Sequence, residues 1–211
     1  MDLFLKSAFW YVVALLWAFA EIELEGKYGW SEKAQTWYRT VTHHPKSLLI
    51  RFIMFGKPLT GYHIPIFLLV LLIAHAHFFM GVRWSIANEL SALALYLAWP
   101  SLWDNLWLFL NPHYGFNNIG PEKVWWYSKS VWLFGKFPLE NTVQWLLSIA
   151  VAFSAFMLTG ESAVLVSHMI LLGYFAVFGS FTVIVLAPLY KKFYFKMREH
   201  DDRDTAGIFH N

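Results

Sequence analysis

The sequence predicts an all-α polytopic integral membrane protein, a bundle of five transmembrane helices with aromatic-rich cytoplasmic loops. The first observation is composition: 58% of the 211 residues are hydrophobic and 14% are charged, whereas a soluble domain carries about 25% charged residues. The second is that apolar residues form continuous runs rather than alternating with polar ones, which favours helices over a β-barrel. The third is the 20% aromatic content, typical of interfacial belts or a stacked core.

Each element of this prediction is an apolar run close to the roughly 20 residues that one bilayer crossing needs. The runs lie at about 3–20, 64–82, 86–110, 142–159 and 163–189. They predict one transmembrane domain over residues 1–190, followed by a charged tail, 191–211. A signal peptide is the alternative for the first run, because Ala18-Phe19-Ala20 resembles a cleavage site. The sparse positive charge before that run favours a retained span.

Basic residues are distributed unevenly between the two ends of the predicted bundle. Five spans place the termini on opposite sides, so the tail shares a face with the long loops at 21–63 and 111–140. That face carries 14 of the 16 Lys and Arg residues, and the other face carries only Lys6 and Arg83. The positive-inside rule makes the basic face cytoplasmic. We therefore expect the cytoplasmic (inner) membrane, with the N-terminus outside and the C-terminus inside.

Acids and histidines recur at one depth, near the cytoplasmic ends of the first three spans. Counting helical rise along each span places five side chains at this level: Glu21, Glu25, His63, Asp104 and His113. If the first helix continues past the apolar run, the two glutamates share a face at i, i+4 spacing. Carboxylate and imidazole ligands suit Fe, Zn²⁺ or Mn²⁺, so the sequence predicts a divalent-metal site formed by these residues.

The same level also suits acid–base catalysis, with Asp104, Glu21 and His113 as the candidate catalytic residues. Intramembrane acids are expensive to bury and usually functional. The alternative is purely structural. A glutamate at the helix end would then be hydrated, and Asp104 would pair with a loop lysine or accept a hydrogen bond from a tryptophan or from Asn105.

A second polar level lies near the outer face. His77 and His168 occupy matching depths on the second and fifth spans, and Glu89 lies within reach at the start of the third. Two histidines on facing helices can ligate haem iron, and with a carboxylate they can hold a metal. Haem is the weaker of the two cofactor predictions. The alternative is that each histidine hydrogen-bonds a neighbouring helix.

Tryptophans form a stripe on the third span, because Trp99, Trp103 and Trp107 recur every four residues. Such a stripe is a candidate wall for a lipid tail or quinone, although core packing is its more frequent role. Basic and aromatic residues also alternate along 123–136. This pattern predicts a segment lying on the inner leaflet, and the membrane explains it better than nucleic acid does.

The polar clusters favour a membrane-embedded, metal-dependent enzyme acting on a lipid or isoprenoid at the cytoplasmic interface. A non-catalytic subunit of a larger membrane complex, packed on protein or pigment partners, is the main alternative. A haem-binding or proton-translocating protein is a further one. The sequence contains no P-loop, dinucleotide-binding, zinc-protease or serine-hydrolase motif. Membrane lipids, and membrane proteins in the subunit case, are the expected partners.

Overall fold

The computed structural model of the chain describes residues 2–30, 32, 57, 60–128 and 130–199. This part of the protein is mostly helical, as predicted. A two-stranded hairpin, β1 (Trp132–Leu133) with β2 (Phe137–Pro138), follows the 3-10 turn Trp125–Tyr127. The last part of the predicted tail, 200–211, lies outside the described residues.

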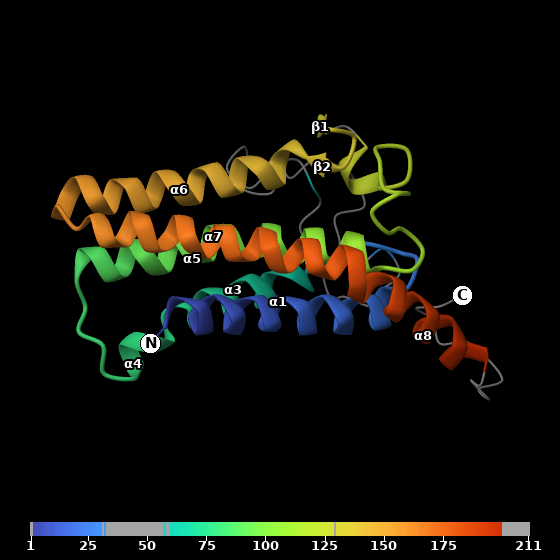
Figure 1. Cartoon of the computed structure of the whole chain (residues 1–211), viewed down its shortest axis with the longest axis horizontal. Helices are drawn as coiled ribbons and strands as arrows, with labels where there is room; N and C mark the ends of the chain where they lie inside the picture. The colour runs from blue at the N-terminus through green and yellow to red at the C-terminus, as the bar shows by residue number, and fades with distance from the viewer. Residues whose placement is uncertain (1, 31, 33–56, 58–59, 129, 200–211) are drawn as a thin grey trace.

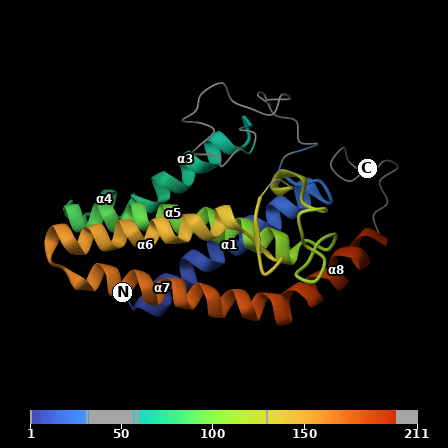
Figure 2. The ribbon, with the colours of Figure 1, turned by 90° about the horizontal axis from the view of Figure 1, so that it is seen from above.

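The helices are α1 (Leu3–Glu25), α3 (His63–Ala74), α4 (Ala76–Phe79), α5 (Ile86–Leu110), α6 (Leu139–Thr159), α7 (Ser162–Phe181) and α8 (Ala187–Glu199). The long helices α1, α5, α6 and α7 lie along one axis, with α6 antiparallel to α5 and to α7, and α8 continues α7 in the same direction (Figures 1 and 2). A π-helical turn, Thr182–Leu186, joins α7 to α8. The start of α1 and the end of α8 therefore lie toward opposite ends of the molecule.

Among the described residues, three helices are long and apolar enough to cross a membrane: Leu3–Glu25, Leu139–Thr159 and Ser162–Glu199. A membrane protein is consistent with these helices. α3 has 12 residues, which extend about 18 Å against a bilayer core of about 30 Å. α5 has 25 residues, but its apolar sequence is interrupted by one proline, two acids and two asparagines. The count of five spans remains a prediction.

The predicted span 64–82 differs from the structure, because the helix is interrupted at His75. The imidazole Nδ1 lies 2.7 Å from the Leu71 carbonyl oxygen, which also accepts the His75 backbone N–H at 3.2 Å. The ring thus competes for a carbonyl that helical hydrogen bonding would use. The chain continues only as the short α4.

α5 is the central helix, and it packs against α1, α3, α6 and α7. The tryptophan stripe lies at the heart of these contacts, since Trp99, Trp103 and Trp107 are all buried. The Trp99 indole Nε1 donates to the Trp10 carbonyl oxygen of α1 at 3.0 Å. The stripe therefore serves helix packing.

The continuous helix α7–α8 is locally widened at the π turn. The turn contains the β-branched run Thr182-Val183-Ile184-Val185, whose side chains crowd a regular α-helix. The Thr182 hydroxyl, fully buried, hydrogen-bonds the Tyr11 hydroxyl of α1. This contact ties the first helix to the last at the point where the helical repeat changes.

Replacing Trp99 by alanine should destabilise the bundle by roughly 3–5 kcal/mol, because it removes a fully buried indole and leaves a cavity. The measurement is thermal unfolding of protein purified in mild detergent. The matched control is Trp84→Ala, since Trp84 is 63% exposed. Equal losses of stability in the two variants would contradict the central position assigned to α5.

Candidate polar pocket

A pocket of about 50 Å³ lies where α1 ends, α3 begins, α5 nears its end and α6 begins. Much of its wall is aromatic, and its polar lining comprises Glu21, Glu25, Lys57, His63, Asp104, Asn141 and Gln144. This volume exceeds the roughly 10–15 Å³ that one water molecule needs. The site therefore combines several ionisable groups with an apolar surround.

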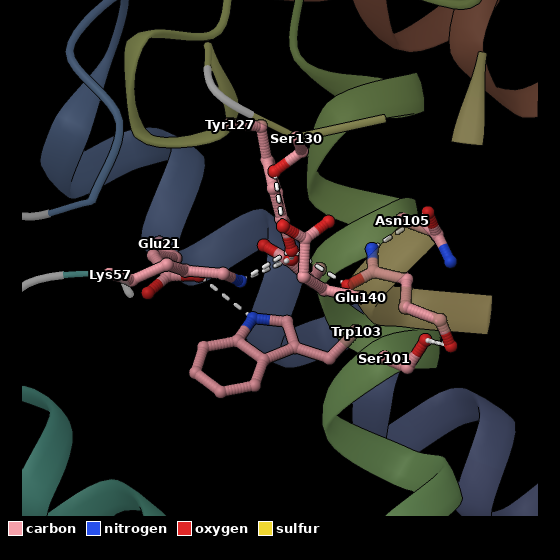
Figure 3. Close-up of polar contacts among 10 residues, drawn as sticks. Glu21, Lys57, Ser101, Trp103, Asn105, Tyr127, Ser130 and Glu140 are labelled. Atoms are coloured by element: carbon pink, nitrogen blue, oxygen red, sulfur yellow. Dashed lines mark hydrogen bonds and ion pairs between the residues drawn. The ribbon is translucent and has the colours of Figure 1, made fainter. Parts of the chain in front are cut away.

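Asp104 is the centre of a polar network that includes Lys57 and Tyr127, both labelled in Figure 3. Lys57 Nζ lies 3.4 Å from Asp104 Oδ2. The Tyr127 hydroxyl donates to the same Asp104 oxygen and accepts from the Lys57 ammonium. Tyr127 is also 2.7 Å from Asn141 Oδ1, and Asn141 Nδ2 donates to Asn105 Oδ1 at 3.1 Å. The network joins the chain at residue 57 to α5, the 3-10 turn and α6.

Burial governs the protonation of the two loop groups in this network. Burial lowers the pKa of the Lys57 ammonium, and the adjacent Asp104 carboxylate acts in the opposite direction. Burial also raises the pKa of the Tyr127 phenol well above its ordinary value, and the Asp104 charge adds to that effect. The phenol consequently stays protonated and serves as a hydrogen-bond donor to the carboxylate.

Glu21 occupies a separate part of the pocket wall. α1 continues to Glu25, so that the two glutamates share the buried face predicted for them, 6% and 5% exposed. Glu21 Oε1 accepts from the Tyr62 hydroxyl at 3.1 Å, and Oε2 accepts from the Trp103 indole at 2.8 Å. Burial, reinforced by the two glutamates, raises the pKa of Tyr62. Both known donors to Glu21 are therefore neutral groups.

His63 is held by stacking and by one hydrogen bond. Its ring stacks on Trp30 at a centroid distance of 4.1 Å and faces Phe67 at 6.0 Å. Nδ1 lies 2.6 Å from Thr60 Oγ1, which also accepts the His63 backbone N–H at 3.4 Å. The side chain is 2% exposed. These contacts fix the ring plane and leave Nε2 as the nitrogen without a hydrogen bond among the described residues.

His113 does not line this pocket, although it was assigned to the same depth. Its Nε2 lies 3.4 Å from the Tyr194 hydroxyl of α8. The neighbouring Asn111 Nδ2 donates to the Gly26 carbonyl oxygen at 2.7 Å, and its Oδ1 accepts the His113 backbone N–H at 3.0 Å. These contacts join the end of α5 to the end of α1.

The outer polar level is arranged differently from the prediction. Glu89 Oε1 lies 3.1 Å from Nε2 of His75, and the Trp84 indole donates to Oε2 at 3.1 Å. His77 Nδ1 is 3.0 Å from the Ala74 carbonyl oxygen, and His168 Nε2 is 3.0 Å from Ser148 Oγ of α6. The predicted haem pair, His77 and His168, thus has separate hydrogen-bond partners.

Metal-ligand geometry is absent from the described part of the chain, where no three His, Asp or Glu side chains are grouped to hold an ion. Four of the five residues assigned to a metal, Glu21, Glu25, His63 and Asp104, nevertheless line the same pocket. The depth predicted for these four residues therefore corresponds to one pocket, in which their side chains can act together.

Sequence reasoning missed Lys57, Tyr127 and Asn141 as members of the site. The structural alternative expected a loop lysine on Asp104 without saying which one, and Lys57 is that residue. Tyr127 belonged to a segment expected on the membrane surface. Tyr127 is instead fully buried and Trp126 is 8% exposed, whereas Trp125 is 43% exposed. The available signal was Asp104 itself, since an acid within an apolar helix requires a donor or a cation.

Comparison with known proteins gave no matching family model, curated protein or solved structure. Any assignment of function to the pocket must therefore come from its own geometry and chemistry.

Replacing Asp104 by asparagine should destabilise the protein by roughly 3–5 kcal/mol, because Lys57 is then buried without its counter-ion. Lys57→Met should be similarly harmful by leaving the carboxylate unpaired. The double variant should recover much of the loss. Thermal unfolding of all four proteins gives the coupling between the two positions. Strictly additive losses would show that the pair contributes no interaction energy.

Proposed function

We propose that this protein is a membrane-embedded enzyme that performs acid–base chemistry on an amphipathic, lipid-like substrate in the polar pocket. The observation that carries the proposal is the convergence of carboxylate, amine and imidazole groups around one aromatic-walled cavity. They come from four separate places in the sequence: the end of α1, residue 57, the start of α3 and the last turns of α5. Perturbed ionisable groups gathered in a cleft are typical of functional sites.

His63 contributes a neutral imidazole that can hydrogen-bond a substrate, because burial, assisted by the Lys57 charge, lowers its pKa to about 3. Its Nδ1 is engaged by Thr60 and its ring is held between aromatic faces. These contacts hold the ring in place through its first nitrogen and leave the second nitrogen available to a substrate. Glu21, a candidate catalytic residue from the sequence, lies on the same pocket wall and supplies a carboxylate for the acid–base step.

Asp104, Lys57 and Tyr127 have a different role in this proposal. Their mutual hydrogen bonds hold an ammonium and a carboxylate at fixed positions in a low-dielectric surround. Such preorganised charges stabilise charge that develops in a transition state. Asp104 therefore acts through the field of the pair rather than as a proton acceptor.

The same contacts bear on the predicted metal. Lys57 places an organic cation against Asp104, and both Glu21 oxygens accept hydrogen bonds from protein donors. A divalent ion at these ligands would have to displace the donors and approach the ammonium. The donor set therefore fits acid–base catalysis better than it fits Fe, Zn²⁺ or Mn²⁺.

The substrate class follows from the surroundings. Three helices of the protein have the length and apolar composition of membrane spans, and Phe67, Trp103 and Trp107 contribute to the pocket wall. A molecule with a polar head and an apolar chain fits these surroundings, because its head would lie among the ionisable groups and its chain against the aromatic rings. A lipid or an isoprenoid has this form.

The test compares lipid extracts from cells that express the wild-type chain, Glu21→Gln or His63→Gln. General acid–base groups contribute about 10²–10⁴-fold to rate, so a product formed by the wild type should fall at least tenfold in both variants. Untargeted mass spectrometry of the extracts gives the readout, and thermal unfolding verifies that the variants are folded.

The matched control is Glu161→Gln, because Glu161 is exposed between the end of α6 and the start of α7, whereas the pocket lies where α6 begins. Its lipid profile should equal that of the wild type. A wild-type profile identical to that of cells carrying an empty vector would overturn the proposed function.

A further inference from the structure

We infer that the polar pocket recognises a primary ammonium group carried on an apolar chain. The inference rests on the proposed function, since it names the substrate class of the same site. It is argued from the charge of the pocket wall, the free acceptor on His63 and the aromatic surfaces that already surround an alkylammonium.

The first step concerns charge. Glu21 and Asp104 are carboxylates of the pocket wall, whereas Lys57 is the only lysine or arginine among the lining residues that the structure describes. Lys57 is directed to Asp104. The known donors to Glu21 are the uncharged Tyr62 and Trp103. A buried carboxylate of this kind is stabilised by an added cation more than by an added neutral group.

The second step concerns His63. Thr60 Oγ1 accepts the His63 backbone N–H and lies 2.6 Å from Nδ1. With Nδ1 protonated and donating to this hydroxyl, Nε2 carries a lone pair and is an acceptor. The side chain is 2% exposed and lines the pocket. A nitrogen at this position can therefore accept from a donor on a ligand or from water that enters the pocket.

The third step concerns the aromatic wall. Lys57 Nζ lies 4.4 Å from the centroid of Trp30 and 4.0 Å from that of Tyr127. These are cation–π distances, so the wall of this pocket already solvates one alkylammonium. Phe67 and Trp103 extend the same surface and offer apolar contact to a chain attached to the nitrogen.

These steps distinguish a primary ammonium from related groups. A primary ammonium presents three N–H donors, which match the carboxylate of Glu21 and the Nε2 of His63. A quaternary ammonium carries the charge without a donor, and an alcohol carries a donor without the charge. An anionic head group would meet the carboxylates unfavourably.

The experiment uses the full chain in phosphatidylcholine nanodiscs and titrates octylamine, with tryptophan fluorescence as readout and empty nanodiscs to subtract partitioning. Octanol, octyltrimethylammonium and ethylamine are the comparison probes. Octylamine should bind at least tenfold more tightly than each of them. Glu21→Gln and His63→Phe should each weaken octylamine binding at least tenfold, and Glu161→Gln should leave it unchanged.

The source of the amine is resolved by repeating the titration in nanodiscs that contain phosphatidylethanolamine. Competition would identify a lipid head group as the occupant, and undiminished binding would identify a free amphipathic amine. Equal affinity for octanol and octylamine, or full octylamine binding by Glu21→Gln, would overturn the inference.

The binding assay is independent of turnover. Specific octylamine binding without any change in the lipid profile of expressing cells would refute the proposed enzyme and leave amine recognition standing. Turnover of a substrate that lacks an amine would refute this inference alone.

Discussion

A carboxylate within an apolar helix dominates the architecture of this protein. Asp104 lies two turns from the end of α5, and transferring such a group from water to an apolar surround is prohibitive unless it is paired. The structure brings Lys57 and Tyr127 to the same carboxylate oxygen. Both residues are distant from Asp104 in the sequence. Compensating the charge of Asp104 therefore requires residue 57 and the 3-10 turn to lie beside the last turns of α5.

The abundance of aromatic residues follows from the same constraint. Trp103 packs in the core and donates its indole N–H to Glu21, and Trp30 presents its face to Lys57 while stacking on His63. An aromatic ring thus fills apolar volume and still offers an N–H, an O–H or a π-face to a charged neighbour. Aliphatic side chains would fill the volume without solvating the charges.

The sequence predicted how deep each residue lies along its helix. It predicted which side chains share a face only for residues of the same helix. The i, i+4 spacing placed Glu21 and Glu25 on one face, and counting helical rise brought His63 and Asp104 to their level, where all four line one pocket. The same counting included His113, which contacts Tyr194 instead. It also ran a helix through His75, because hydropathy does not register an imidazole that bonds a carbonyl of its own helix. The contacts of Lys57 and Tyr127 depend on the conformation of loops, which have no repeating sequence pattern from which a contact could be predicted.

The balance of charge in the pocket connects stability with recognition. Among the described lining residues the one ammonium, Lys57, is placed on Asp104 rather than shared with Glu21. A pocket neutralised entirely by its own side chains would be more stable and would have little affinity for a charged ligand. Among the described residues, Glu21 is left to neutral donors. In the proposed recognition, an ammonium that enters the pocket pairs with this carboxylate, so that binding supplies the counter-charge that the described fold does not.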